Sequence, residues 1–542
     1  MSGRVLAAAA ARRFLLLLVL LAAVLGIPAQ RLLAASCSVV KHNPPTDADK
    51  AFLAADFTKA ENLFRTGLAA HPGDVDLTAG LIHTLLREQK VQEAADAVKT
   101  ALAANANSAP LLTLRGEVEF RQGEPWVVEQ TVLASYKLDP CNPRTRLLFA
   151  RFATVNSRYA TARQQIQIAH QFDPEDPEIR AAWIQTLPLK QRIAEEEALL
   201  ATSTGNDADV LRQMHTELDR WKKQVSEPAR TCQLVSKTTA AGLPFIRLMA
   251  RQHPRAYGLD VGLNGNSTRL QLGGGEGGLT VYRAVAERAG LKRITPSEPG
   301  AYPGAKPTYV AYAETIKVGD LEFQNCPVTV IDAGNPNDDG DGNIGSEVFS
   351  DFLVTFDYQM RKMQLGPLPP RPAEASAPAP RLRTVTGWDG ESADSASVAY
   401  DRFIAPEMKD YTQAYRVGNS VILPAIVNGA KVKLFNLDMN LDLFAPTTDI
   451  ALGVAKEVSK VYEKDFGGAK VSFADDITFN FARMSQKLNG VNTTDTGMTS
   501  KNAGMELSGS IGRDAIKLLI LHVDYRDGLV KFEYIPDRGS FQ

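Results

Sequence analysis

The chain has few of the residues that build metal centres. Among its 542 residues there are four cysteines and seven scattered histidines, and neither an H-E-x-x-H nor a C-x-x-C pattern occurs. Because these patterns bring zinc ligands together, their absence predicts no metal site. The chain also lacks an excess of charge of either sign, since its formal net charge is −2. Without a broad basic surface, nucleic acid is not expected as a partner.

The longest apolar run lies at the N-terminus. Three arginines precede "FLLLLVLLAAVLG" (Phe14–Gly26), and small residues follow in "LLAASC". A basic segment, an apolar stretch of this length and a small-residue site are typical of a secretory signal peptide. We therefore expect a signal peptide over residues 1–36 and a periplasmic or extracellular protein. Two alternatives stay open: acylation of Cys37, which would anchor the chain to a membrane, and an uncleaved N-terminal anchor, for which the apolar run is short.

Export makes the four cysteines candidates for disulfides. Cys232 and Cys326 flank the same predicted domain, so we expect these two residues to pair. Cys37 and Cys141 can form a second pair if Cys37 carries no lipid. Free buried thiols are the alternative for all four residues.

Residues 47–225 read as helical and repeat with a period of 34. Pro140 and Pro174 each end a predicted helix, and Pro72 lies two periods before Pro140. Small or apolar residues keep the same step, as in Ala60, Ala94, Val128 and Ala162, and in Phe64, Val98, Val132 and Ile166. A helix–turn–helix unit of this length resembles the tetratricopeptide repeat. The resemblance implies an all-α solenoid of about four repeats whose groove binds peptides or partner proteins. A purely structural spacer is the alternative.

The second half of the chain contains two copies of one β-rich pattern. "DVGLNGNSTRLQL" and "AIVNGAKVKLFNL" each read as a strand, an Asn-Gly turn and a second strand. Downstream, "GNIGSEVFSDFLVTFDY" and "GSIGRDAIKLLILHVDY" share G-x-I-G and an apolar strand that ends in Asp-Tyr. We therefore expect two all-β units, at 232–368 and 401–540. Between them, at 369–400, lies a Pro/Ala/Ser-rich linker that cannot build a core.

This β-rich unit resembles the retropepsin-like aspartic protease domain. That family has a hairpin, an apolar strand ending in D-[ST]-G-A-S, a short helix and a closing apolar-apolar-Gly turn. "LTVYRAVAERAGL" is similar to the segment that follows the active-site loop, and "GDGNIGSEVF" is similar to the closing turn. The resemblance gives Gly342, Gly345, Gly509 and Gly512 a structural role in the two closing turns. An exported repeat array joined to such units is similar to bacterial tetratricopeptide-repeat aspartyl proteases.

The resemblance implies one catalytic aspartate from each unit, because aspartic proteolysis uses two facing carboxylates that share a proton. In the first unit this position falls at Gly273, so the acid is missing there. Glu276 stands three residues too far along the loop to take its place. In the second unit Asp438 falls at or beside the position, with Met439 and Asn440 in place of Thr-Gly.

The missing acid favours an exported protein that is catalytically inactive or impaired and that binds peptides through its repeats and its protease-like cleft. The substrate-binding residues would be Gly274, Gly275, Glu276, Met439 and Asn440. The alternative is an active endopeptidase that uses Asp438, for example from two chains of a dimer. The sequence leaves the oligomeric state open.

The glycines of "LGGGEGG" also fit the dinucleotide-binding G-x-G-x-x-G. A Pro/Gly-rich loop follows where that fold needs a strand with an acidic end, so we expect no cofactor.

Two other motifs have competing explanations. The literal D-T-G at Asp495-Thr496-Gly497 lies in a polar stretch with no apolar strand before it, so we expect a mobile loop there. "NDDGDGNIGSE" is similar to a calcium-binding EF-hand loop. However, Val348 occupies the twelfth position, where such loops need glutamate, and the closing turn of the β-rich unit explains the glycines without calcium.

Overall fold

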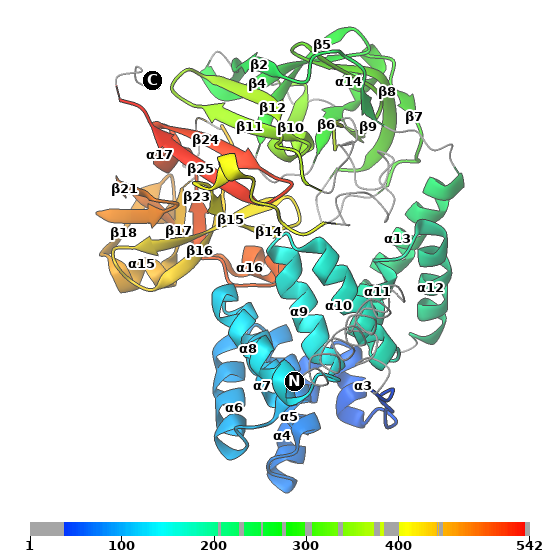
Figure 1. Ribbon diagram of the computed structural model, residues 1–542. Coiled ribbons are helices and arrows are strands. Elements are labelled where there is room, and N and C mark those ends of the chain that lie inside the picture. Colours follow the sequence, from blue (N-terminus) through cyan, green and yellow to red (C-terminus); the bar gives the residue numbers. More distant parts are fainter. Residues whose placement is uncertain are drawn as a thin grey trace, which may run out of the picture.

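The computed structural model describes residues 37–203, 207–226, 232–250, 253–273, 278–298, 306–333, 340–372, 380–383, 400–441, 443 and 448–536. Helices fill the first part of this range and strands the second (Figure 1). The expected fold class, an all-α array followed by two all-β units, is confirmed. The predicted signal peptide lies outside the described residues. Within them, we find no helix with the length and apolarity needed to span a membrane.

The helical array is built from antiparallel pairs whose ends recur every 34 residues. Its helices are α3 (Asp47–Leu53), α4 (Phe57–Ala70), α5 (Val75–Arg87), α6 (Val91–Ala104), α7 (Ala109–Arg121), α8 (Pro125–Leu138), α9 (Pro143–Val155), α10 (Tyr159–Phe172), α11 (Pro177–Ile184), α12 (Leu189–Thr202) and α13 (Ala208–Ser226). In four of them, α5, α7, α9 and α11, the N-cap side chain accepts a hydrogen bond from the first turn. These caps are Asp74, Ser108, Asn142 and Asp176. Capping of this kind satisfies amide groups that a helix start leaves unpaired.

Residues 232–368 form the first β unit (unit 1). Its elements are β1 (Gln233–Leu234), β2 (Ala241–Pro244), β3 (Ile246–Ala250), β4 (His253–Leu263), β5 (Asn266–Gly273), β6 (Leu279–Tyr282), α14 (Arg283–Arg288), β7 (Lys292–Arg293), β8 (Thr308–Val318), β9 (Leu321–Ile331), β10 (Gly342–Gly345), η1 (Ser346–Phe349), β11 (Phe352–Asp357) and β12 (Lys362–Pro367). Asn264 and Gly265 both have positive φ and make the predicted tight turn between β4 and β5.

Residues from 401 onward form the second β unit (unit 2). Its elements are η3 (Pro406–Met408), β13 (Thr412–Gln413), β14 (Tyr415–Val417), β15 (Ser420–Val427), β16 (Val432–Leu437), β17 (Asp449–Ala451), α15 (Leu452–Val458), β18 (Val461–Phe466), β19 (Ala469–Ala474), β20 (Ile477–Phe481), β21 (Met484–Leu488), β22 (Val491–Thr494), α16 (Gly497–Ala503), β23 (Gly509–Ile511), α17 (Arg513–Ile516), β24 (Leu519–Asp524) and β25 (Leu529–Tyr534). Most of these strands form one large sheet, as those of unit 1 do.

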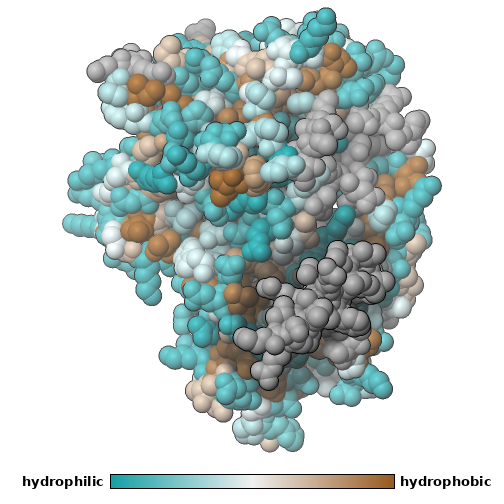
Figure 2. Space-filling view, viewed as in Figure 1, coloured by the Kyte–Doolittle hydropathy of each residue, from teal (hydrophilic) through white to brown (hydrophobic). Residues whose placement is uncertain are grey.

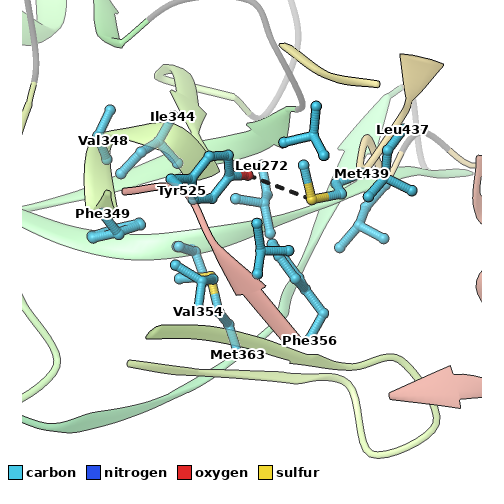
Figure 3. Packing of buried hydrophobic residues seen from close by; sticks show 14 of the residues in the cluster. Leu272, Ile344, Val348, Phe349, Val354, Phe356, Met363, Leu437, Met439 and Tyr525 are labelled. Atoms are coloured by element: carbon cyan, nitrogen blue, oxygen red, sulfur yellow. Dashed lines mark hydrogen bonds between the residues drawn. The ribbon is translucent and has the colours of Figure 1, made fainter. Parts of the chain in front are cut away.

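The two units share a six-stranded sheet with the order β13-β25-β24-β11-β12-β2. At its centre β11 of unit 1 pairs antiparallel with β24 of unit 2, with Val354 opposite Val523. Both side chains are fully buried in one core that continues through both units. Figure 3 shows this core, in which residues of both units pack around Met439 and Tyr525. The units therefore form an intramolecular pseudo-dimer rather than two independent domains.

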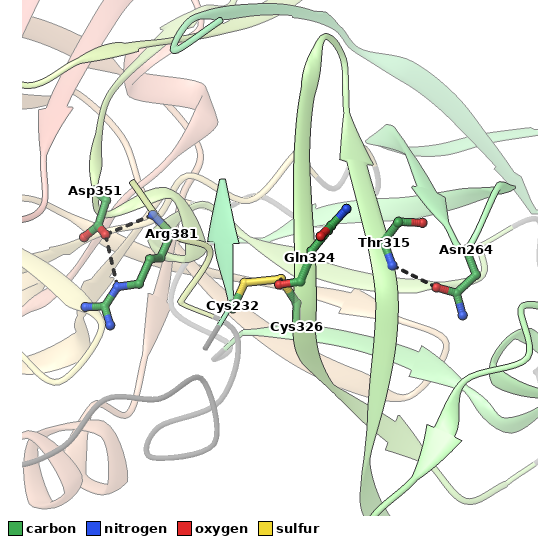
Figure 4. The surroundings of a disulfide bond; sticks show 7 residues. All are labelled: Cys232, Asn264, Thr315, Gln324, Cys326, Asp351 and Arg381. Carbon is green, nitrogen blue, oxygen red and sulfur yellow. Dashed lines mark hydrogen bonds and ion pairs between the residues drawn. A yellow bond between two sulfur atoms is a disulfide. The ribbon is translucent and has the colours of Figure 1, made fainter. Parts of the chain in front are cut away.

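Part of the predicted linker is packed rather than free. Leu382 is fully buried in the core of the β units, and the Arg383 amide donates to the carbonyl of Val348 (2.9 Å). Arg381 donates its amide to Asp351 (3.1 Å, Figure 4). The expectation that this stretch contributes nothing to a core is therefore wrong for residues 380–383. Residues 373–379 and 384–399 lie outside the described part of the chain.

Both cysteine pairs named from the sequence are disulfides in the structure. Cys232 joins Cys326 (Figure 4), and Cys37 joins Cys141. The first bond connects the start of β1 to β9, which pair with each other. One sulfur atom cannot carry both a disulfide and a thioether-linked lipid. The alternative of a lipid anchor at Cys37 is therefore incompatible with this structure.

The array packs on both β units. Arg121 at the end of α7 donates to the carbonyl of Ser500 (2.8 Å), and its own carbonyl accepts from the Glu506 amide (2.9 Å). Met505 is fully buried in the same contact. At the far end of the array, Lys223 of α13 forms an ion pair with Glu298 of unit 1 (3.2 Å). In Figure 2 hydrophobic residues gather near the helical part of a mostly hydrophilic face.

Candidate functional site

The strand register identifies equivalent positions in the two units. In unit 1, β5 runs parallel to β10, with Leu272 opposite Ile344 and Gly273 opposite Gly345. In unit 2, β16 runs parallel to β23, with Leu437 opposite Ile511. The residue that follows Leu437 is Asp438, and its amide donates to the Ile511 carbonyl (3.0 Å). Gly273 and Asp438 are therefore structurally equivalent, and only one of the two positions carries an acid.

The loops that contain these two positions adjoin each other. The Leu441 amide, three residues past Asp438, lies 3.5 Å from the Leu272 carbonyl, and the Tyr257 amide donates to the Leu441 carbonyl (3.0 Å). Figure 3 shows Leu272 and Leu437 on either side of Met439. The pseudo-dimer thus brings the two active-site-like loops together at the boundary between the units.

Asp438 is half-buried, and its Oδ1 accepts a hydrogen bond from the Asn440 amide (2.8 Å). Met439 points the other way. Only 2 % of its surface is exposed, and its sulfur lies 3.5 Å from the Tyr525 hydroxyl and 3.9 Å from that of Ser346. The prediction that Met439 binds substrate is therefore wrong for its side chain, because it fills the core between the units.

Beside Asp438, the phenol of Tyr358 is fully buried, and its oxygen has no hydrogen-bond partner among the described residues. Burial, together with Tyr525 and the charge of Asp438, raises the pKa of Tyr358 well above its usual value. Tyr525, its counterpart in unit 2, instead bonds Ser346 (2.5 Å). The surroundings of the single acid are thus apolar and asymmetric.

On the unit 1 side, Gly273 faces open space, because no atom lies within 4 Å of the point where a side chain's Cβ would sit. Gly274, Gly275 and Glu276 lie outside the described residues. A buried acid that the sequence reasoning missed, Glu347, lies at the end of this loop. Its Oε1 accepts from the Gly278 amide (2.7 Å), and it packs directly over Gly345. The acid two residues past the second glycine of G-x-I-G in both copies was the available signal.

The glycines of the closing turns have steric reasons to be glycine. A Cβ at Gly342 would lie 2.0 Å from the Thr280 carbonyl oxygen, and one at Gly509 would lie 2.2 Å from that of Asp449. Gly509 also has a φ of +133°. Such close approach of strand backbones leaves no room for a side chain.

Neither of the two competing motifs contributes to this site. Strand β22 leads into Asp495-Thr496-Gly497 and α16 follows it, so the expectation of a stretch without a preceding strand is wrong. Asp495 is exposed and accepts from the Gly497 amide (2.8 Å). Asp341 of the EF-hand-like stretch accepts from the Arg269 amide (2.9 Å) and pairs with Arg288 (3.0 Å). We find no cluster of metal-binding side chains in the described parts of the chain.

A second candidate site is a cavity of about 250 Å³ in the repeat array. Much of its lining comes from equivalent positions of successive repeats, 34 residues apart: Phe52, Leu86 and Phe120; His83, Glu117 and Arg151; Arg87 and Arg121. Leu148 and Glu178 complete the array's side, and Gly504 of unit 2 lines the cavity as well. Because the repeat itself generates this surface, we call it the repeat groove.

The carboxylates of the repeat groove are paired with cations. Glu117 lies 2.8 Å from His83, and Glu178 lies 2.6 Å from Arg151 and 3.1 Å from Arg144. Burial alone would raise the pKa of Glu117, but His83, Arg144 and Arg151 hold it below its usual value. The groove is thus lined by neutralised acids and by arginines.

A family model described as tetratricopeptide repeat matches residues 51–118. No curated protein matches the chain. Among solved structures, a thermophilic TPR protein of Thermus thermophilus is 17% identical, covering 32% of this chain and 95% of its own, with a TM-score of 0.27. A retropepsin-like aspartic protease from Rickettsia conorii is 13% identical, covering 24% of this chain and 94% of its own, with a TM-score of 0.18.

A further similar structure is YrrB, a TPR protein with an unusual peptide-binding site. It is 15% identical, covers 32% of this chain and 88% of its own, and has a TM-score of 0.19. The match to the repeat model agrees with the 34-residue recurrence of helix caps and turns. The chain thus contains tetratricopeptide repeats, followed by a β-rich region of two pseudo-symmetric units with retropepsin-like architecture.

Proposed function

We propose that this exported protein binds peptides or partner proteins through its repeats and its protease-like cleft, and that it does not cleave them. The observation that carries the proposal is the strand register, which makes Gly273 the counterpart of Asp438. A single carboxylate has no second acid with which to share a proton, so one of the two roles in aspartic proteolysis is unfilled. The two disulfides favour export, because such bonds persist in oxidising compartments.

The surroundings of Asp438 support the same proposal. The next side chain, Met439, is used for packing between the units instead of lining an accessible cleft. Tyr358 and Tyr525 lie buried nearby without offering a second carboxylate. The competing proposal is an active endopeptidase in which Asp438 works with an acid from another chain.

Cleavage of an unfolded, fluorescently labelled protein at acid pH separates the two proposals. We expect no cleavage above background from the native chain and none from its Asp438→Ala variant. Cleavage by the native chain that disappears in Asp438→Ala would overturn the binding-only function and support the endopeptidase. The rate measured over a range of protein concentrations would then report whether a dimer is needed.

Gly273→Asp tests whether the missing acid is tolerated in its expected place. Since no atom lies within 4 Å of the Cβ position, we expect the free energy of unfolding in urea to change by less than about 1 kcal/mol. Gly509→Ala is the control, because its Cβ would meet the Asp449 carbonyl at 2.2 Å and its φ is positive. There we expect a loss of about 3 kcal/mol or more. Equal losses in both variants would contradict the equivalence of Gly273 with an open acid position.

A further inference from the structure

The repeat groove is formed by the array and unit 2 together. Gly504, which ends α16 with a φ of +70°, lies in the wall of the cavity beside α5, α7 and α9. Arg121 connects the two walls, because its Nη1 donates to the Ser500 carbonyl (2.8 Å). The cavity therefore has a fixed geometry that the docked β unit helps to set.

Two arginines at one end of the groove lack a carboxylate. Arg87 and Arg121 are equivalent residues at the ends of α5 and α7, and we call them the arginine pair. Among the described residues, neither has a carboxylate oxygen within 4.0 Å. Arg87 lies over the ring of Phe57 (5.4 Å), and Arg121 bonds Gln89 and Ser500 through neutral oxygens.

The charge of Arg121 is held in a largely dehydrated place. Its exposed fraction is 9 %, and burial lowers its pKa from the usual value. A buried cation without a neutralising carboxylate is costly, so an anion entering the cavity would gain more there than at an exposed arginine. The groove's own acids, Glu117 and Glu178, are already paired with other cations.

Next to the arginine pair the groove is apolar. Phe52, Leu86 and Phe120 occupy equivalent positions of three successive repeats, and Leu148 lies beside them. A ligand that satisfies both parts needs carboxylates and apolar side chains close together along an extended chain. Negatively charged small ions would use the arginines but leave the apolar surface uncovered.

We propose that the repeat groove binds an extended acidic segment of a partner protein, with carboxylates at Arg87 and Arg121 and apolar side chains on Phe52, Leu86 and Phe120. This inference rests on the proposed function, in which the repeats bind protein. It adds the chemistry of the bound segment and the contribution of unit 2 to the site.

Fluorescence anisotropy with the full chain tests this proposal. The probes are three labelled ten-residue peptides in which leucine alternates with glutamate, glutamine or lysine. We expect the glutamate peptide to bind at least about tenfold more tightly than the glutamine peptide at 50 mM salt, with the preference reduced at 300 mM. Arg87→Gln should weaken glutamate-peptide binding about tenfold and leave glutamine-peptide binding nearly unchanged.

Arg65→Gln is the matched control, because Arg65 is a half-exposed arginine of α4 that is absent from the groove lining and pairs with Glu61 and Glu93. It should bind all three peptides as the native chain does. Equal binding of all three peptides, or an Arg87→Gln variant that still prefers glutamate, would overturn the acidic specificity while leaving peptide binding in place. Absence of binding by any peptide would count against both this inference and the proposed role of the repeats.

Discussion

Asp524 is a fully buried carboxyl in the turn that joins β24 to β25, next to a second buried carboxyl, Asp527. Asp527 is paired with two arginines, Arg371 (2.5 Å) and Arg526 (2.9 Å). Asp524 accepts the Asp527 amide (3.0 Å) but has no ion pair among the described residues. Burial and the negative charge of Asp527 raise the pKa of Asp524 to about 6.

This shift predicts a pH dependence of stability. Because the folded pKa lies above the unfolded value, the stabilising proton is fully bound below about pH 4 and is lost as the pH rises through 6. Relative to Asp524→Asn, which cannot titrate, the native chain should lose about 2 to 3 kcal/mol of unfolding free energy between pH 4 and pH 7. Urea denaturation at several pH values measures this difference. Parallel curves for the two proteins would contradict it, and the exposed Asp495→Asn serves as control.

At the residue scale the sequence predicted the missing acid but left its partner uncertain by one position. The count from Gly265 to Gly273 is one shorter than the count from Gly429 to Asp438. The structure explains the difference, because residues 428–431 separate β15 from β16, whereas two residues separate β4 from β5. Turn length is not visible in the apolar pattern, so only the strand register could remove the ambiguity.

At the scale of elements, the turns inside the helix pairs all contain one residue with left-handed backbone. Ala55, Gln89, Gly123 and Ser157 have φ values between +55° and +73° and lie 34 residues apart. Three of these four are not glycine, so the turn itself tolerates a side chain. Gly123 has a different reason to be glycine, since a Cβ there would lie 2.4 Å from the Glu506 carbonyl oxygen of unit 2.

Gly123→Ala should therefore weaken the docking of the array on unit 2 while the repeat keeps its fold. We expect a loss of about 1 to 3 kcal/mol, typical of overpacking, and faster hydrogen exchange of the Glu506 amide, which is bound to Arg121. Gly73→Ala is the matched control, because Gly73 also has positive φ (+90°) but no atom within 4 Å of its Cβ position. Unchanged exchange at Glu506 in Gly123→Ala would refute the steric explanation.

Elements with periodic patterns were predictable, and short irregular ones were not. The helices of the array follow from caps and apolar residues that repeat every 34 positions. Leu382 is a single apolar residue in a Pro/Ala-rich stretch, and its burial depends on a site made by distant residues of unit 1. Strand β22 is short and mostly half-buried, so no alternation marked it in the sequence.

At the scale of the whole molecule, the shared sheet makes the stability of one β unit depend on the other. Val523→Asp places a charge in the centre of β24, opposite the fully buried Val354 of unit 1. We expect a loss above about 4 kcal/mol, since an unpaired buried charge is among the most destabilising changes. Limited proteolysis followed by mass spectrometry should find new cleavage sites in unit 1 as well as in unit 2.

Val432→Asp provides the same chemical change on β16, where the side chain is 36 % exposed. It should leave the proteolysis pattern close to that of the native chain. If Val523→Asp opened unit 2 while unit 1 stayed resistant, the two units would be energetically independent despite their paired strands.

The place of β24 in the chain also sets the order of events during synthesis. The contacts within the repeats are local, so the array can fold while the ribosome is still making the rest. Strand β11 instead pairs with a strand made more than a hundred residues later, and until then its apolar edge is open to other chains. The slow, aggregation-sensitive step in folding is therefore completion of the central sheet, and premature termination before β24 should yield chains with folded repeats and an unsealed β region.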